Sequence, residues 1–289
     1  MKKIAFLIAG YKGYNFLKII HKECKVACVV SYATEGTLDN SYDFIRKLCR
    51  KEKYNFFEKR DLDMGCLKAD LIFIVGWQYL LDKIDDRIIV FHDSLLPKFR
   101  GFAPTVNALI LGNNRIGVTA LKPHTQRDAG PICAQTALTV KYPLRIKDAY
   151  DQLAFCYVQI ARDILRKSQL GKLKYYKQNN NFASYSLWRD KFDYLIDWSW
   201  PAKKIARFVD ALSWPYLGAK TMYEQEEIVV DKVIAVNDIN FVERHPGKIW
   251  NLKDNMPEVI CGEGIVRILS AMSADGKKLI FTKLRKRFG

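Results

Sequence analysis

The stretch MKKIAFLIAGYKGYNFLKIIHKECKVACVVS, residues 1–31, predicts a strand, a helix and a second strand in close succession. Its two short apolar runs, Ile4–Ala9 and Val26–Ser31, have the length and composition of buried strands. The segment Tyr14–Glu23 between them carries its apolar residues at helical spacing. Strands that are apolar throughout and are separated by helices predict a parallel sheet that is covered on both faces.

The same alternation continues over about the first 125 residues. A helix is predicted at Ser41–Glu52, and further strands are predicted at Leu71–Val75, Ile88–Phe91 and Ile116–Leu121. The predicted fold class is therefore α/β, with a doubly wound, mostly parallel sheet. Ligands of such sheets bind beyond the carboxyl ends of the strands. This rule directs attention to the loops that follow Ala9, Val75, Phe91 and Leu121.

The second half of the chain has a different pattern. Helices are predicted at Asp148–Lys167 and Pro201–Leu212. Short β-like runs follow at Ala219–Tyr223, Ile228–Val236, Val259–Cys261, Ile265–Ser270 and Leu279–Thr282. We therefore predict a main domain over residues 1–200 and a small C-terminal β domain over residues 201–289.

The composition favours anionic partners and a reducing compartment. Lys and Arg number 47 against 31 Asp and Glu, and this excess favours a nucleotide, a polyanionic cofactor tail, RNA or an acidic membrane surface. The seven cysteines form no CxxC pair, which indicates free thiols in the cytoplasm and no zinc or other metal site. No apolar run approaches the roughly 18–20 residues of a membrane span, and Ile4–Gly10 is too short for a signal peptide.

Two segments carry residues typical of catalysis. In VFHDSLLPKFRGFAP, residues 90–104, His92 directly follows a predicted strand, Pro97 stiffens the turn and Gly101 permits close backbone approach. In QRDAGP, residues 126–131, Asp128 lies in a Gly/Pro turn. A lone histidine at a strand end is most often structural, and an aspartate in such a turn is usually a turn former. Because His92 and Asp128 follow two separate strands and can converge, the pair indicates acid–base chemistry.

These motifs resemble those of the folate-dependent formyltransferases, a family that includes methionyl-tRNA formyltransferase, glycinamide ribonucleotide transformylase and the sugar N-formyltransferases. The matching residues are HDSLLP at 92–97, RGFAP at 100–104, GVT at 117–119, DAG at 128–130, IDWS at 196–199 and ALSWP at 211–215. They occur in consistent order over most of the chain. The resemblance implies a Rossmann-like catalytic domain and N10-formyltetrahydrofolate as the formyl donor.

The resemblance also implies that His92 and Asp128 are catalytic residues of an acyl transfer to a primary amine. His92 would take a proton or stabilise the oxyanion, and Asp128 would hold His92 or an ordered water. The family has a catalytic Asn two residues before the His, where this chain has Val90. Loss of one oxyanion donor costs about 10²–10³ in rate. We expect another donor, such as Ser94, Gln78 or a backbone N–H; a slow enzyme and a catalytically impaired binding protein are the alternatives.

The remaining site residues are also implied by the resemblance. Cofactor contacts are expected at Gly76, Gln78, Tyr79, Leu80 and Thr125; the alternative for the first four is a strand end with packed aromatic residues. The first loop would hold a phosphate of the acceptor through Gly10, Lys12 and Gly13, or be a plain tight turn. Further acceptor contacts are expected at Ser94, Arg100, Gly101 and Phe102.

Two classes of acceptor remain open. The tRNA enzymes carry a Gly/Arg/Lys-rich insertion after the second strand, whereas Ser31–Asn40 contains neither Arg nor Lys and would be a poor clamp for RNA. We therefore favour a nucleotide-linked amino sugar, as in lipopolysaccharide and O-antigen biosynthesis, over methionyl-tRNA. The C-terminal β domain would serve either substrate contact or formation of a homodimer.

Overall fold

The computed structural model describes residues 1–64, 67–79 and 84–289. These residues form two compact units. Unit 1 comprises Met1–Thr105, Arg115–Val140 and Asp148–Leu187, and unit 2 comprises Val106–Asn114, Lys141–Lys147 and Trp188–Gly289. Unit 1 contains a seven-stranded sheet and unit 2 a five-stranded sheet. The predicted domain division at residue 200 stays a prediction.

The seven-stranded sheet has the strand order β3-β2-β1-β4-β5-β7-β8. Its strands are β1 (Lys3–Ile8), β2 (Lys25–Ser31), β3 (Phe56–Glu58), β4 (Leu71–Val75), β5 (Ile88–His92), β7 (Arg115–Leu121) and β8 (Ile132–Thr139). The first five strands in this order are parallel, whereas β7 is antiparallel to both β5 and β8. The predicted fold class, α/β with a mostly parallel sheet, is confirmed.

The direction of β7 corrects one expectation. The loop after Leu121 was predicted to leave the carboxyl edge of a parallel sheet, but Leu121 pairs with Val90 and the antiparallel strand ends toward the opposite edge. Consistent with this, the Lys122 ammonium donates to the carbonyl of Asp86, just before β5. A buried antiparallel strand is as apolar as a parallel one, so the composition of this strand could not predict its direction.

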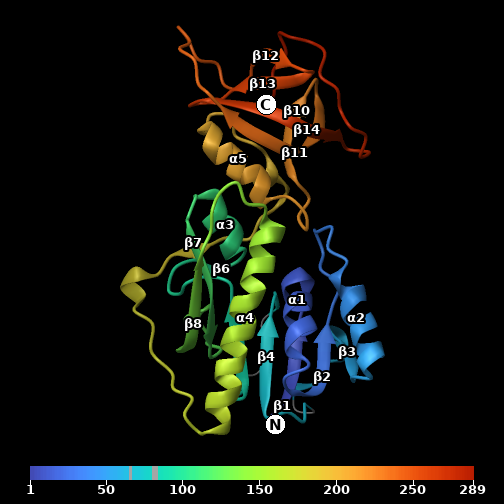
Figure 1. Cartoon of the computed structure of the whole chain (residues 1–289), viewed down its shortest axis with the longest axis vertical. Helices are drawn as coiled ribbons and strands as arrows, with labels where there is room; N and C mark the ends of the chain where they lie inside the picture. The colour runs from blue at the N-terminus through green and yellow to red at the C-terminus, as the bar shows by residue number, and fades with distance from the viewer. Residues whose placement is uncertain (65–66, 80–83) are drawn as a thin grey trace. The chain divides into compact units, whose positions relative to one another are not determined.

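One face of the sheet is covered by helices α1 (Gly10–Ile20) and α4 (Ile146–Gln169), which lie side by side in Figure 1. Aromatic side chains join them to the strands: Phe16 of α1 lies 5.4 Å from Phe91 and 6.0 Å from Tyr157 of α4, between ring centroids. On the other face, Val30, Ile74 and neighbouring residues form an apolar cluster against which Trp77 and Val90 pack. Helix α2 (Ser41–Glu52) begins and ends where the sequence predicts.

Helix α1 begins four residues before its predicted start at Tyr14. The Tyr11 N–H donates to the carboxylate of Asp39 at 2.6 Å, from the loop that precedes α2. This carboxylate satisfies one of the N–H groups that have no partner within a helix. Because it comes from 28 residues away, the local pattern could not predict the earlier start.

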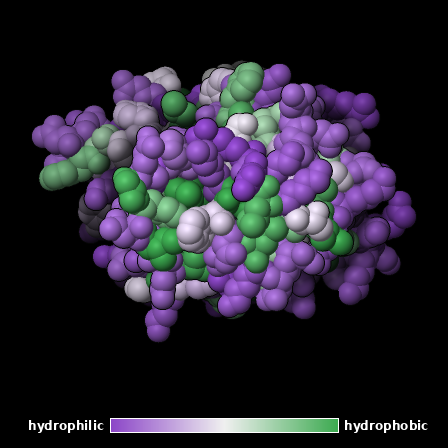
Figure 2. Space-filling model, turned by 90° about the horizontal axis from the view of Figure 1, so that it is seen from above, coloured by the Kyte–Doolittle hydropathy of each residue, from purple (hydrophilic) through white to green (hydrophobic). Residues whose placement is uncertain are grey.

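Unit 2 is built around an antiparallel sheet with the strand order β10-β11-β14-β13-β12. Its elements are α5 (Ala202–Ala211), β10 (Ala219–Tyr223), β11 (Glu226–Val236), β12 (Ile249–Lys253), β13 (Met256–Ile260) and β14 (Ile265–Ser273). The predicted small β domain is confirmed as an antiparallel sheet. The strand predicted at Leu279–Thr282 is wrong, because Ile280 is exposed and only Phe281 of that run is fully buried. Figure 2 shows a mainly hydrophilic face of the molecule with separate hydrophobic patches.

Two very short strands in unit 1 join distant segments. Strand β6 (Arg100–Gly101) pairs in parallel with β9 (Tyr185–Ser186), and the chain between these strands includes α3 (Pro104–Ile110) and the 3-10 helix Asn180–Phe182. Gly101 has φ +101, and a Cβ there would lie 2.4 Å from the carbonyl oxygen of Ser186. Only glycine fits at this close approach. The pairing fixes the turn that follows β5.

The cysteine side chains form part of the apolar core. The six cysteines in the described residues are free and buried, and burial raises the pKa of Cys24, Cys49, Cys133 and Cys261 to about 12. These thiols therefore act as apolar core groups.

None of the helices in the described ranges combines the length and the apolar character needed to cross a membrane.

Candidate active site

Strand β5 carries His92 to the end of the parallel part of the sheet. Side chains alternate along a strand, so Val90 and His92 share one face while Phe91 points to the other. Phe91 packs on the helix-covered face, with its ring 6.0 Å from that of Tyr157. His92 therefore lies on the face opposite α1 and α4, where it is 7% exposed.

The two ring nitrogens of His92 have different environments. Nε2 lies 2.8 Å from the carbonyl oxygen of Phe99. A carbonyl can only accept, so Nε2 carries the hydrogen. Nδ1 faces Asp128, with 3.7 Å between Nδ1 and Oδ2. Nδ1 is therefore the nitrogen that can take and release a proton, and the protonated ring would lie between a carbonyl oxygen and a carboxylate.

The turn behind His92 is held by its own polar groups. Phe99, which has φ +58, donates its N–H to Ser184 Oγ at 2.9 Å. The Ser94 hydroxyl donates to the carbonyl of Lys98 at 2.7 Å, and the Thr119 hydroxyl donates to the carbonyl of Ser94. The Ser94 proton is thus used within the turn, which weakens Ser94 as a replacement oxyanion donor. Its predicted contact with the acceptor stays a prediction.

Asp128 reaches His92 from a loop that starts at the far edge of the sheet. Its Oδ2 accepts the Gly101 N–H at 2.8 Å, so the turn after β5 also orients this carboxylate. Asp128 has φ +49, a conformation that L-residues adopt rarely. Two residues on, a Cβ at Gly130 would lie 1.9 Å from the carbonyl oxygen of Lys122. The structure thus brings the predicted pair together through a tightly folded loop.

Arg100 and Phe102, predicted to contact the acceptor, have partners within the protein. Arg100 is 1% exposed, and its guanidinium donates to the side-chain oxygens of Gln178, Asn180 and Tyr185. The guanidinium of Arg127 lies 4.2 Å from the centre of the Phe102 ring. Direct contact of Arg100 with an acceptor would require it to leave these partners. Gln178 was missed, because a polar, Asn-rich stretch carries no catalytic signal.

Two carboxylates of the protein already bind the loop that was predicted to hold a phosphate. The Asp39 carboxylate accepts the Tyr11 N–H, and Oδ1 of Asp93 lies 2.8 Å from the Lys12 ammonium. Thr105 donates to the other oxygen of Asp93 at 2.7 Å. Burial raises the pKa of Asp93, but the charges of Lys12 and His92 and the hydrogen bonds outweigh this and lower it to about 2. The charge of Lys12 is thus balanced internally, and phosphate contact by Gly10, Lys12 and Gly13 stays a prediction.

The predicted cofactor loop after β4 is aromatic. Tyr32 packs edge-on against Trp77 and Tyr79, with ring centroids 5.1 and 4.9 Å apart, and its hydroxyl accepts the Gln78 N–H at 3.0 Å. Burial raises the pKa of Tyr32 to about 12, so the hydroxyl stays neutral. Within the described residues, the buried Nε1 of Trp77 has no hydrogen-bond partner. Tyr79 is 44% exposed, so this set offers a ring on which a flat heterocycle can stack.

The other predicted cofactor residues are placed less completely. Gly76 has φ +69 and approaches the carbonyl of Ala9 so closely that a Cβ would lie 2.3 Å from that oxygen. Thr125 is exposed in the loop that leads to Asp128. Leu80 lies outside the described residues. The cofactor contacts therefore stay predictions, with the aromatic loop as the best-supported part.

Val90 makes the neighbouring part of the site apolar. Its partners in register on the adjacent strands are Ile74 and Leu121, and it packs with Trp77 against the apolar cluster of this face. Paired residues of neighbouring strands share a face, so these side chains surround it. The position two residues before His92 therefore offers no polar group.

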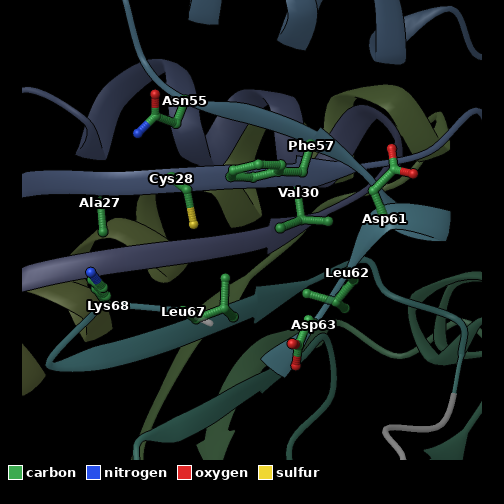
Figure 3. A pocket seen from close by; sticks show the side chains of 10 residues that line it. All are labelled: Ala27, Cys28, Val30, Asn55, Phe57, Asp61, Leu62, Asp63, Leu67 and Lys68. Carbon is green, nitrogen blue, oxygen red and sulfur yellow. The ribbon is translucent and has the colours of Figure 1, made fainter. Parts of the chain in front are cut away.

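A hollow of about 210 Å³ lies elsewhere on the same face, at the β2–β3 edge. The residues that line it include Cys28, Val30 and Asp61. Figure 3 shows the side chains of Cys28, Val30, Leu62 and Leu67 around a common space. None of the predicted site residues lines this hollow, so it is separate from the His92–Asp128 centre.

Comparisons with known proteins show the family and the fold. The family model described as "Formyl transferase" matches residues 2–161, and "Formyl transferase, C-terminal domain" matches residues 189–288. A methionyl-tRNA formyltransferase of Wigglesworthia glossinidia brevipalpis is 26% identical over 247 residues, which span 82% of this chain and 75% of the relative.

Solved structures share the fold at low identity. WlaRD, a sugar 3N-formyl transferase solved in the presence of dTDP and 5-N-formyl-THF, has a TM-score of 0.67 at 17% identity and covers 98% of this chain and 99% of its own. HypX from Aquifex aeolicus, in complex with tetrahydrofolic acid, has a TM-score of 0.64 at 18% identity. That match covers 96% of this chain and 46% of HypX, so the chain spans about half the length of HypX.

Proposed function

This chain belongs to the formyl transferase family, which carries out folate-dependent one-carbon transfer, and we propose that its acceptor is the primary amine of a nucleotide-linked amino sugar. The product would be a formamido sugar of the kind used in O-antigen and lipopolysaccharide synthesis. Cytoplasmic location and a homodimer remain predictions beside this proposal.

We propose that the cofactor is held by the aromatic loop after β4. When bound, N10-formyltetrahydrofolate supplies a formyl group on a nitrogen that can depart. The exposed ring of Tyr79, which packs edge-on against Trp77, would provide a face for stacking. Gln78 is exposed, so its side chain is free of the core and can turn toward the formyl group.

His92 would move the proton that the reaction must relocate. Its Nδ1 takes up the proton that the acceptor amine loses as the new N–C bond forms, because Nε2 is already bound to Phe99. The resulting imidazolium is stabilised by the Phe99 carbonyl and by Asp128. His92 then delivers the proton to the departing nitrogen, so the protons balance. The positive charge of the imidazolium would also stabilise the oxyanion through space, where Val90 provides no hydrogen-bond donor.

The observation that carries the choice of acceptor is the loop between β2 and α2. It has no Lys or Arg, and its Asp39 carboxylate is fixed by the N–H groups of Tyr11 and Ser41 at 2.6 and 2.8 Å. An anchored acidic loop repels an RNA backbone. The charges of the C-terminal part, residues 188–289, also nearly cancel, with 17 Lys and Arg against 14 Asp and Glu.

The positive surplus lies instead in residues 1–187, which contain 30 Lys and Arg against 17 Asp and Glu. A compact anion such as a pyrophosphate needs only a few cations near the site, whereas tRNA requires many phosphate contacts along an extended surface. WlaRD, whose name describes a sugar 3N-formyl transferase, supports this acceptor class by its full-length fold match.

Methionyl-tRNA is the second candidate acceptor. The sequence relatives support it, because the Wigglesworthia protein named as a methionyl-tRNA formyltransferase aligns over 82% of this chain. The charge distribution argues against it. A transfer assay decides between the two.

The test is formyl transfer from N10-formyltetrahydrofolate to a panel of amino-sugar nucleotides and, in parallel, to charged initiator tRNA. We expect kcat/KM for at least one sugar nucleotide to exceed that for tRNA by about 100-fold or more. The His92→Ala protein is the matched control for background transfer. Turnover of tRNA alone would overturn the sugar assignment, and folate binding without turnover of either class would indicate the catalytically impaired binding protein.

A further inference from the structure

Arg100 is a fully buried cation with neutral partners. It is 1% exposed, and in the part of the chain that the structure describes its side-chain bonds go to the oxygens of Gln178, Asn180 and Tyr185. Burying a guanidinium is costly unless its donors are satisfied. The cost indicates that the groups it bonds must be held in one arrangement.

Arg100 determines how the Gln178 amide is oriented. A guanidinium has donors only, so the oxygen of the amide must face it: Oε1 accepts from Nε at 3.2 Å and from Nη2 at 2.7 Å. The amide nitrogen is thereby turned to the other side. There Nε2 donates to the carbonyl oxygens of Asp128 at 2.7 Å and Gly130 at 2.8 Å. All four hydrogen-bonding positions of this buried amide are filled.

The two carbonyls that Gln178 binds belong to the turn that presents Asp128. This turn includes the unfavourable φ of +49 at Asp128, which persists only where its surroundings hold it. The residue after Arg100 acts on the same target, because the Gly101 N–H binds the Asp128 carboxylate. Gln178 thus holds the backbone of Asp128, and the Gly101 N–H holds its side chain.

We propose that Gln178, oriented by Arg100, is a positioning residue that sets the place of Asp128 against Nδ1 of His92. The inference rests on the proposed role of Asp128 in formyl transfer, whichever amine accepts the group. Oδ2 of Asp128 and Nδ1 of His92 are 3.7 Å apart. A displacement of Asp128 by about 1 Å can lower the rate about 10²-fold.

Gln178→Met tests this, because it keeps the length of the side chain and removes both donors and the acceptor. We expect kcat to fall about 10- to 100-fold while KM for folate and acceptor changes less than about threefold. Asn181→Ala, an exposed position three residues away, is the matched control and should leave both constants unchanged. Arg100→Lys keeps a donor for Oε1 and should retain more activity than Arg100→Met.

Two further measurements keep the result decisive. Gln178→Glu can still pair with Arg100 and remain folded, yet it cannot donate to the two carbonyls, so it should lose kcat as Gln178→Met does. The ¹⁵N shifts of the His92 ring report on Asp128 without turnover, and in both Gln178 variants they should move toward those of Asp128→Asn. Unchanged kcat or unchanged ring shifts in a folded Gln178 variant would overturn the proposal.

The same design separates this inference from the acceptor assignment. If the native protein turns over tRNA and no sugar, the acceptor is wrong, and the Gln178 variants are then compared on tRNA. If the native protein shows no turnover at all, the ring shifts alone decide whether Gln178 positions Asp128.

Discussion

Unit 1 and unit 2 differ in which segments supply the partners of their buried charged side chains. Around the end of β5 in unit 1, Asp93 and Arg100 are 6% and 1% exposed. In unit 2, an ion pair such as Lys277–Asp275 has side chains that are 83% and 56% exposed. Glu258 of unit 2 is also buried, at 8% exposure, but its partner Arg267 lies directly opposite on the neighbouring strand, so the pair joins β13 and β14 locally.

The difference agrees with the proposal that unit 1 carries the chemistry. Buried charges destabilise a fold unless they are paired and hydrogen-bonded, whereas exposed pairs change stability little. Unit 1 satisfies its buried charges through bonds between segments far apart in the chain: Asp93, next to His92, binds Lys12, and Arg100 binds Gln178, which binds the Asp128 backbone. We attribute that arrangement to a site that must be preorganised.

The largest effect on activity should come from His92→Ala. Removing the group that we propose moves the proton should lower kcat/KM about 10³-fold, within the usual range for acid–base catalysis. His245→Ala in unit 2, where the side chain is 40% exposed, is the matched control and should change kcat/KM less than about twofold. Steady-state transfer kinetics with circular dichroism of both variants measure this. Comparable losses in the two variants would remove the distinction between the units.

Asp93→Asn should cause the largest loss of stability. It leaves the Lys12 ammonium, whose side chain is 19% exposed, without the carboxylate 2.8 Å away. Breaking a buried pair in this way costs about 3–5 kcal/mol. Urea unfolding of the variant and the native protein would measure it, and a change below about 1 kcal/mol would contradict the buried-pair interpretation.

The same pair predicts a dependence on pH. The pKa of Asp93 is lowered to about 2 in the folded state, from an ordinary value near 3.8. Its ionised form therefore stabilises the fold above about pH 4, and about 2 kcal/mol is lost as the pH falls toward 2. Acid unfolding of Asp93→Asn should lack this contribution, and identical acid transitions in both proteins would argue against it.

Val90→Asn should have a smaller effect on both properties. The amide would enter an apolar cluster beside Ile74 and Leu121, so the free energy of unfolding should fall by about 1–2 kcal/mol. If His92 or Gln78 already serves the oxyanion, kcat should change less than about threefold. Val90→Thr, with nearly the same shape, controls for packing. A gain of about 100-fold in kcat would instead show that the native protein lacks an oxyanion donor.

The smallest effect should come from Glu227→Gln in unit 2. The carboxylate lies 2.6 Å from Lys220, but it is 46% exposed, and such pairs contribute less than about 1 kcal/mol. Urea unfolding in low and high salt should show little difference between the variant and the native protein. A loss as large as that of Asp93→Asn would erase the contrast between the units.

Much of this protein could be predicted where the signal is local. The bounds of α2, β4 and β10 were predicted correctly, because apolar periodicity reports directly on short buried elements. The strand at Ile249–Lys253 was missed, since Trp250 and Asn251 are exposed and an edge strand lacks a continuous apolar run. The roles of His92 and Asp128 were predicted from motifs, and they stay predictions until the variants are measured.

The sequence by itself determined the fold class and brought His92 to the end of a buried strand, because strand composition and a contiguous motif are properties of neighbouring residues. Only the tertiary structure decided which nitrogen of His92 is free, that β7 runs antiparallel, and that Lys12 is paired with Asp93. It also decided the place of Gln178, which lies 78 residues from Arg100 and 50 from Asp128. These features depend on the directions of hydrogen bonds between distant segments, and such directions exist only once the chain has folded.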